Sequence, residues 1–331
     1  MALDFAGQWR LAGIPSRSPI NKEKTVLDVR NVFKAYSSVK AVDGISFSAK
    51  PGEIFGLIGP NGAGKSTTIR MIMNILAPDS GSILLDGKSL TEADKGRIGY
   101  LPEERGLYKK MKVGDMLAFL AEIKGADKAA SARRADDWLK RFDILDWKGR
   151  KVEELSKGMA QKVQFIGTVA HDPDVLLFDE PFSGLDPVSQ DLLLDAMLEL
   201  KAAGKTVLFS THIMDHAERI CERIFLINKG REVASGSLAQ VKAGFGSDAA
   251  RIEYDGDASF VEGLPYVTST RAFPRWLEVG LKGEDAADRL FRDLAGRVRV
   301  RRFEILEPSL HSIFIRLVGG DANENGENGN A

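Results

Sequence analysis

The fold is decided by the stretch Gly59-Pro60-Asn61-Gly62-Ala63-Gly64-Lys65-Ser66, which fits the spacing G-x-x-x-x-G-K-[ST] at every fixed position. A short apolar run of strand type, residues 54–58, precedes it, and residues 67–73 are typical of a helix with one apolar face. The glycines allow backbone N–H groups to turn inward around a phosphate, and the helix N-terminus adds partial positive charge there. We therefore expect a phosphate-binding loop in which Lys65 reaches the β- and γ-phosphates and Ser66 gives its hydroxyl to Mg²⁺.

Composition limits the classes of function that remain. The chain has 331 residues with 46 Lys plus Arg against 47 Asp plus Glu, so it lacks the global basic excess that draws proteins onto nucleic acid or anionic lipid. Its single cysteine, Cys221, excludes an internal disulfide framework and fits a reducing compartment. No segment approaches the ~20 consecutive apolar residues that span a bilayer, and the early Asp4 argues against a signal peptide. We expect a cytosolic chain whose role at a membrane depends on a partner.

Changes in pattern along the chain predict four parts. Residues 1–24 show no clear period and are expected to be a poorly ordered extension, with a docking arm as the alternative. Residues 25–240 alternate strand and helix patterns, which predicts a large α/β domain. Residues 241–317 contain three strand runs around one helical run and predict a small α+β domain. Residues 318–331, rich in Asn, Gly and acids, are expected to be a disordered tail.

Two further strands end in polar side chains. The apolar run 175–178 leads into Asp179 and Glu180, and the run 206–211 leads into His212. The carboxyl ends of parallel strands are where ligands bind in an α/β sheet. Beside a phosphate loop, Asp179 is suited to hold Mg²⁺ through water and Glu180 to orient or deprotonate an attacking water. The alternatives are two solvated acids at a strand end and, for His212 with His216, a metal pair that lacks a nearby third ligand.

Other segments between these motifs also suggest roles. Tyr36 lies upstream of the phosphate loop, where its ring either stacks on adenine or merely packs at a strand end. Apolar positions at helical spacing over 113–124 and a second helical stretch over 128–142 predict a helical insertion. Ser156 is well placed to cap a further helix. In the last domain, alternating Arg297, Arg299 and Arg301 form a basic strand face, either solvated with ion-pair partners or a contact for RNA or lipid.

Taken together, residues 25–240 resemble the ATP-binding-cassette (ABC) ATPases. The resemblance implies an α/β P-loop NTPase fold with an antiparallel β subdomain and an inserted helical subdomain at about 103–160, followed here by the small α+β domain. It implies ATP and Mg²⁺ as ligands, with Glu180 as base, His212 as γ-phosphate and water positioner, and Lys65 as charge stabiliser. The metal would be held by Ser66, Asp179 and Glu103. The nucleotide would contact Tyr36, Gly59, Asn61, Gly62, Ala63, Gly64, Lys65, Ser66, Thr67, Glu103, Ser156, Gly158 and Asp186.

In this family two subunits pair head to tail, so Ser156 and Gly158 would touch the γ-phosphate bound by the other subunit. Three residues depart from the usual pattern: Lys157 and Met159 replace a glycine and the glutamine of the signature L-S-G-G-Q, and Glu103 replaces a glutamine. These departures, with residues 99–108 and the ending at 307–314, are similar to ATP-binding subunits of bacterial exporters of the sodium-efflux type.

The leading hypothesis is an ATPase subunit at the inner face of the cell membrane that drives a separate integral-membrane permease. The inserted helices and the loop at Glu103 would carry the contact with that permease. The paired ATPase subunit would be a copy or a relative, and no nucleic-acid partner is expected. The alternative is a soluble ABC-type ATPase acting on nucleic acid or ribosomes. It is disfavoured because the insertion is a compact helical one and the chain carries one cassette. A pure nucleotide sensor conflicts with the complete set Asp179, Glu180 and His212.

Overall fold

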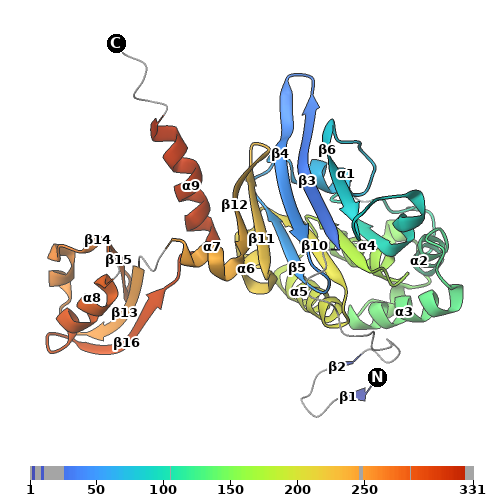
Figure 1. Cartoon of the computed structure of the whole chain (residues 1–331). Helices are drawn as coiled ribbons and strands as arrows, with labels where there is room; N and C mark the ends of the chain where they lie inside the picture. The colour runs from blue at the N-terminus through green and yellow to red at the C-terminus, as the bar shows by residue number, and fades with distance from the viewer. Residues whose placement is uncertain are drawn as a thin grey trace. The chain divides into compact units, whose positions relative to one another are not determined.

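The computed structural model describes residues 2–3, 9–10, 26–104, 106–245, 249–283 and 285–324. The chain divides into two compact units, Met1–Ser235 and Gly236–Ala331, close to the boundary expected at residue 240 (Figure 1). In the extension expected at 1–24, strand β1 (Ala2–Leu3) pairs with β2 (Trp9–Arg10), and the rest of that extension lies outside the described residues.

A six-stranded sheet in the order β12-β11-β5-β10-β9-β8 forms the centre of the first unit. The pairs from β11 to β8 run parallel, as strand–helix alternation predicts. Every residue of β5, β9 and β10 is buried, because parallel strands of this kind are covered on both faces. The six strands are β5 (Ile54–Ile58), β8 (Ile98–Leu101), β9 (Val175–Asp179), β10 (Thr206–Thr211), β11 (Arg223–Asn228) and β12 (Arg231–Ser237).

A second, four-stranded antiparallel sheet has the order β4-β3-β6-β7 and confirms the expected β subdomain. Phe47 of this sheet lies 5.1 Å, between ring centroids, from both Phe55 of β5 and Phe225 of β11. The main apolar core therefore fills the space between the two sheets, where it also buries the inward face of the first helix. The strands are β3 (Leu27–Tyr36), β4 (Val39–Ala49), β6 (Ser80–Leu85) and β7 (Lys88–Ser89).

Helices complete the first unit, and three of them build the expected helical subdomain (Figure 1). Trp138, Phe142 and Phe165 pack edge-on or stacked at centroid distances of 5.6–5.9 Å, and Phe165 contacts Phe178 of β9. This aromatic cluster joins the subdomain to the central sheet. The subdomain helices are α2 (Val113–Glu122), α3 (Lys128–Arg141) and α4 (Lys157–Val169), and the others are α1 (Lys65–Ile72), α5 (Pro187–Ala202) and α6 (Met214–Ile220). Short 3₁₀ turns are η1 (Glu92–Arg97), η2 (Leu145–Trp147) and η3 (Val152–Glu154).

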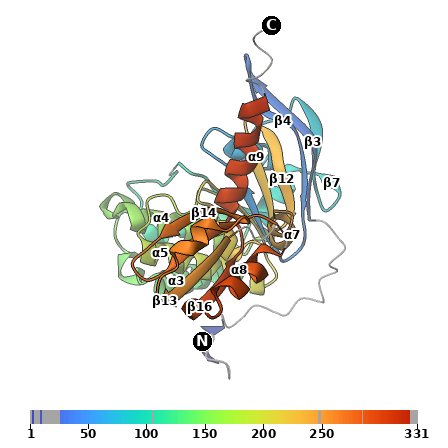
Figure 2. The same ribbon diagram turned by 90° about the vertical axis from the view of Figure 1, so that its left-hand side faces the viewer.

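The second unit is an antiparallel sheet in the order β14-β15-β13-β16, covered on one face by helix α8 (Figure 2). Its core gathers apolar residues of α8, such as Leu290 and Leu294, and of the strands, such as Ile252 and Val279. The strands are β13 (Ala249–Asp255), β14 (Val267–Ala272), β15 (Leu277–Leu281) and β16 (Arg299–Leu306). The helices are α7 (Leu238–Ala243), η4 (Ser259–Gly263), α8 (Ala286–Leu294) and α9 (Leu310–Glu324).

The structure corrects two expectations for this unit. Strand β14 was not predicted, because its sequence is mostly polar and four of its six residues are exposed. The expected tail at 318–331 begins as helix, since α9 continues to Glu324. Leu310 and Ile313 are buried at the start of α9, and extending a helix that is already formed costs less than starting one. Residues 325–331 lie outside the described part of the chain.

Candidate active site

The phosphate loop follows β5 and leads into a helix, as predicted, although α1 begins at Lys65, two residues before the expected start. A Cβ at position 59 would lie 2.1 Å from the carbonyl oxygen of Ile227, and one at position 64 would lie 2.3 Å from that of Ala41. Gly64 also has φ of 107°, in the left-handed region that favours glycine. The two outer glycines of the motif are therefore required by the packing of the loop against β11 and β4, independently of any ligand.

Lys65 lies folded over this loop with its side chain buried. Its Nζ donates hydrogen bonds to the carbonyl oxygens of Gly59 at 2.8 Å and Pro60 at 3.2 Å, and it lies 3.1 Å from Oε1 of Glu180. On the other side of the same carboxylate, Nδ1 of His212 lies 2.9 Å from Oε2. The structure thus brings the three predicted catalytic residues into one chain of contacts, Lys65–Glu180–His212.

Glu180 is held in an unusual conformation at the end of β9. Its φ is 48°, a left-handed value that is uncommon outside glycine, and the residue is 6% exposed. Sparsely populated backbone conformations persist where the surrounding structure enforces them, and they concentrate at functional sites. Here the Glu180 N–H donates to both the carbonyl oxygen and the hydroxyl of Ser210 on β10, at 3.2 and 3.1 Å.

Ser210 is the site residue that the sequence analysis missed. Its fully buried hydroxyl donates to Oδ1 of Asp179 at 2.5 Å while it accepts from the Glu180 N–H. One side chain therefore binds the carboxylate of Asp179 and the backbone of Glu180. The available signal was its position directly opposite Asp179 in the parallel β9–β10 register, two residues before His212.

Most of the remaining residues expected around the phosphates are exposed or partly exposed, whereas Ala63 is buried. Ser66 and Thr67 are half-buried in the first turn of α1, and Asn61 and Gly62 are exposed in the loop. Glu103 is exposed just after β8. That loop is attached to α4, because Nε2 of Gln164 donates to the carbonyl oxygens of Pro102 and Glu104.

Tyr36 is the last residue of β3, and its ring is 47% exposed. It faces Val39 across the hairpin, which is also exposed. The residue thus lies at the surface rather than in the core, and adenine stacking stays a prediction.

The signature residues contact a different part of the chain from the phosphate loop. Ser156 caps α4, with its hydroxyl accepting from the Met159 N–H at 3.3 Å. Asp186 caps α5, accepting from the N–H and the hydroxyl of Ser189 at 3.0 and 2.7 Å. The hydrogen bonds to Ser189 hold the pKa of the Asp186 carboxyl below its usual value. Gly158 lies near Leu185 of the turn between β9 and α5.

Two buried histidines serve the fold rather than this site. His216 packs on Phe182 with ring centroids 4.3 Å apart, and burial lowers its pKa. His171 follows α4, and burial with the nearby Lys124 lowers its pKa to about 4. Among the described residues no cluster of three or more His, Cys, Asp or Glu side chains is placed to hold a metal ion, so the alternative of a His212–His216 metal pair gains no support.

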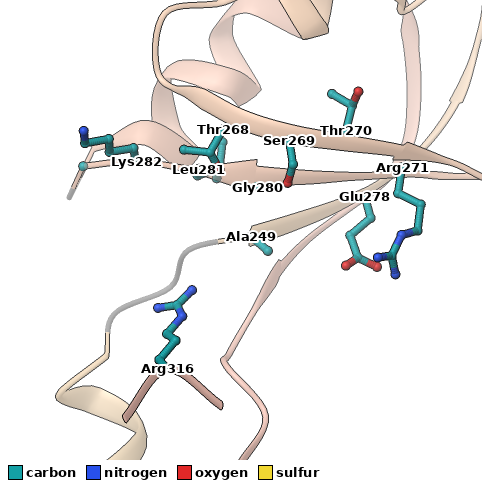
Figure 3. Close-up of a pocket in the computed structure, with 11 residues that line it drawn as sticks. Ala249, Thr268, Ser269, Thr270, Arg271, Glu278, Gly280, Leu281, Lys282 and Arg316 are labelled. Carbon is teal, nitrogen blue, oxygen red and sulfur yellow. The ribbon is translucent and has the colours of Figure 1, made fainter. Parts of the chain in front are cut away.

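The second unit contains a polar hollow of about 510 Å³ beside β14 and β15 (Figure 3). Hydroxyls of Thr268 and Ser269 lie over Gly280, and Arg271 faces Glu278 across the strands. Its lining combines hydroxyls and ionic groups without a catalytic pair such as Glu180–His212.

Of the arginines expected on one basic strand face, Arg299 and Arg301 lie on β16, whereas Arg297 lies in the turn before it. Arg301 pairs with Asp255 at 2.7 Å, and the Arg297 guanidinium lies 4.8 Å from the Phe260 ring centroid. Arg301 thus has the kind of ion-pair partner that the solvated-face interpretation expects, whereas Arg297 contacts an aromatic ring.

Comparisons with known proteins agree with the geometry. Residues 42–183 match the ABC transporter family, and residues 236–318 match the C-terminal domain of ATP-binding proteins of the DrrA1-3 type. An uncharacterized ABC transporter ATP-binding protein of Bacillus subtilis, YhaQ, is 43% identical over 294 residues, covering 89% of this chain and 99% of that protein. The Nod factor export ATP-binding protein I of Burkholderia pseudomallei is 36% identical, covering 88% and 97%. The linearmycin resistance ATP-binding protein LnrL of Bacillus subtilis is 31% identical, covering 89% and 98%.

Solved structures give the same result for the first unit. An ATP-binding subunit of an ABC transporter superposes with a TM-score of 0.63 at 34% identity, covering 67% of this chain and 93% of that one. CbiO1 of Clostridium perfringens, from an ABC transporter complex, gives 0.59 at 30% identity, covering 66% and 91%. The chain belongs to the ATP-binding subunits of ABC transporters, the family that hydrolyses ATP to power transport.

Proposed function

We propose that this chain is the ATP-hydrolysing subunit of an exporter and drives a separate membrane permease. The observation that carries the proposal is the Lys65–Glu180–His212 chain of contacts at the carboxyl edge of the central sheet, beside the phosphate loop. Export is supported by relatives whose names refer to Nod factor export and linearmycin resistance. Among the described helices, none has the length and apolar character needed to cross a bilayer.

The proposed chemistry is attack of water on the γ-phosphate of ATP. Glu180 accepts a proton from the water, and the water oxygen bonds to the γ-phosphorus. The bond between the γ-phosphorus and the oxygen that bridges to the β-phosphate breaks, which releases ADP and phosphate. The Lys65 ammonium leaves Glu180 for the β- and γ-phosphates and compensates their charge. His212 exchanges its contact with Glu180 for the γ-phosphate and the water.

The oxygen donors of the site fit Mg²⁺. Asp179 offers a carboxylate that is 1% exposed and already oriented by Ser210, and Ser66 offers a hydroxyl in the first turn of α1. Mg²⁺ prefers oxygen ligands and is commonly held by one or two protein groups together with substrate phosphates, so a large protein cluster is not required. When bound, it would neutralise charge on the phosphate oxygens. Glu103 is the third proposed ligand.

The site is proposed to be completed by a second subunit. Ser156 and Gly158 open α4 on an exposed or half-exposed surface. Ser156 caps its own helix and Gly158 lies near Leu185 of the turn at 181–186. Because the N-terminus of α4 carries partial positive charge, it suits the γ-phosphate of a nucleotide bound by the partner. The partner is a second copy or a related ATPase chain.

The helical subdomain offers the surface for a permease. Tyr108 and Phe119 pack edge to face with centroids 5.6 Å apart, yet are 52% and 38% exposed, and nearby Ile123 is 60% exposed. Exposed aromatic and aliphatic groups of this kind are typical of protein contacts. Gln164 links the adjacent loop at 102–104 to α4, which supplies a mechanical path from that surface to the signature.

Fractionation of native cells followed by a mild-detergent pull-down tests this proposal. We expect the tagged chain to sediment with membranes at their cytoplasmic face and to bring down a multi-spanning protein. A double variant, Phe119→Ser with Ile123→Ser, should lose that protein while Leu198→Ser, also exposed, should keep it. Recovery with ribosomes or DNA instead would favour the soluble ATPase and overturn the transport assignment.

A further inference from the structure

The side chain of Lys157, at the first position of α4, lies directly over Gly184. A Cβ built on Gly184 would be 2.6 Å from Cε, 3.0 Å from Nζ and 3.3 Å from Cδ of Lys157. The lysine stem thus occupies the place that any other residue at 184 would fill. Gly184 has φ of 73°, so both its conformation and the available space favour glycine.

Two further contacts join the same segments. Nε2 of Gln161, one turn along α4, donates to the carbonyl oxygen of Pro181 at 3.1 Å. A Cβ on Gly158 would lie 3.9 Å from Cδ2 of Leu185, within van der Waals contact. The N-terminal turn of α4 and the turn at 181–186, which follows Glu180 directly, are therefore packed together along their length.

Electrostatics alone does not explain a lysine at this position. A cation at the N-terminus of a helix is opposed by the helix dipole, typically by about 0.3–1 kcal/mol. Its long aliphatic stem can instead cover a neighbouring surface while the ammonium stays in water. Lys157 is exposed, as this arrangement requires.

We propose that Lys157 is a positioning residue that holds the turn at 181–186 against the N-terminus of α4. The two segments then meet the nucleotide of a second subunit as one unit. This inference rests on the proposed composite site and assigns a role to the residue that replaces the usual signature glycine. The packing, rather than the charge, carries the effect.

A double-mutant cycle on ATP turnover tests the contact. In the parent, Gly184→Ala displaces the end of Lys157, which is flexible, so we expect kcat to fall. The left-handed conformation at 184 is unfavourable for alanine, so the melting temperature should fall by a few degrees, and by a similar amount in the parent and in Lys157→Ala. In a Lys157→Ala background the added Cβ meets no lysine stem, and only the backbone strain of the left-handed conformation remains. The two effects of Gly184→Ala on kcat should differ by at least about threefold. Equal effects in both backgrounds would overturn the proposal.

Two more variants separate packing from charge. Lys157→Met keeps the stem and removes the charge, so its kcat should stay within about twofold of the parent, whereas Lys157→Ala should fall further. If Lys157→Met and Lys157→Ala lower kcat equally, charge is the operative property, and if neither lowers it, Lys157 has no role in turnover; either result overturns the positioning role. The KM for ATP should move less than kcat in every variant, and Lys88→Met, on exposed β7, serves as the surface control.

The ATPase rate of the parent protein, measured at several protein concentrations, distinguishes failure of this inference from failure of the proposed function. A site built from two chains gives a rate per chain that rises with protein concentration. A rate that is independent of concentration in a monomeric protein would remove the composite site and this inference with it. A concentration-dependent rate with additive mutational effects would remove only the role of Lys157.

Discussion

Replacing Ser210 by alanine should lower the stability of the first unit and also leave the carboxylate of Asp179 less well oriented. The substitution deletes the donor to Asp179 Oδ1, a buried carboxylate, whereas the Glu180 N–H keeps its second acceptor, the Ser210 carbonyl oxygen. Hydrogen bonds to charged groups contribute about 1.5–3 kcal/mol, so one such loss predicts a fall of about 2 kcal/mol in the free energy of unfolding. The small space left by the hydroxyl adds little.

Urea unfolding of the variant and the parent measures this difference. The matched control is Ser235→Ala, whose hydroxyl bonds Glu232 at the surface and whose loss should cost less than about 0.5 kcal/mol. If the free energy of unfolding of Ser210→Ala lies within about 0.5 kcal/mol of that of the parent, the hydrogen bond from Ser210 to Asp179 does not contribute as argued. The Mg²⁺ concentration for half-maximal ATPase activity should also rise, because Asp179 loses the group that orients it; an unchanged value would place Asp179 outside the metal site.

Three further outcomes are expected. Glu180→Gln should keep ATP binding, measured by a fluorescent nucleotide, while turnover falls by about 10²–10⁴-fold, since the base is lost. Glu103→Gln should change turnover or its Mg²⁺ dependence by more than about twofold in ATPase assays, since it removes the charge of a proposed metal ligand. The pKa of His171 is lowered to about 4, so the unfolded chain takes up a proton between pH 6.5 and 4 that the folded chain excludes. Stability should therefore fall as pH falls through this window, by up to ~3 kcal/mol, and His171→Asn should flatten that slope in urea titrations.

That the three proposed catalytic residues lie close together could be predicted, because each belongs to a local sequence pattern. Lys65 belongs to a loop with fixed spacing, and Glu180 and His212 end apolar runs that can only be buried parallel strands. The topology then places these strand ends at one edge of one sheet. The geometry adds what spacing does not contain, namely that Lys65 and His212 both contact Glu180.

The role of Ser210 and the presence of strand β14 could not be predicted from the sequence, for physical reasons. A serine inside an apolar strand has the same sequence pattern whether its hydroxyl serves a carboxylate or a backbone group, and only the β9–β10 register separates the two. Strand β14 is mostly solvent-exposed and is fixed by pairing with β15, so it needs no apolar alternation. The finer resemblance to sodium-efflux exporters stays a prediction, because cargo choice is not encoded in the ATP site.

Light scattering of the Glu180→Gln variant, with and without ATP, tests most directly the claim that two subunits form one hydrolytic site. Slow turnover preserves the bound nucleotide, so ATP should convert the variant to a particle with the mass of two chains, whereas ADP should not. The double variant Glu180→Gln with Ser156→Glu should not undergo this conversion, because the charge of the new glutamate repels the γ-phosphate. A variant that binds ATP and keeps the mass of one chain at micromolar concentration would contradict the account.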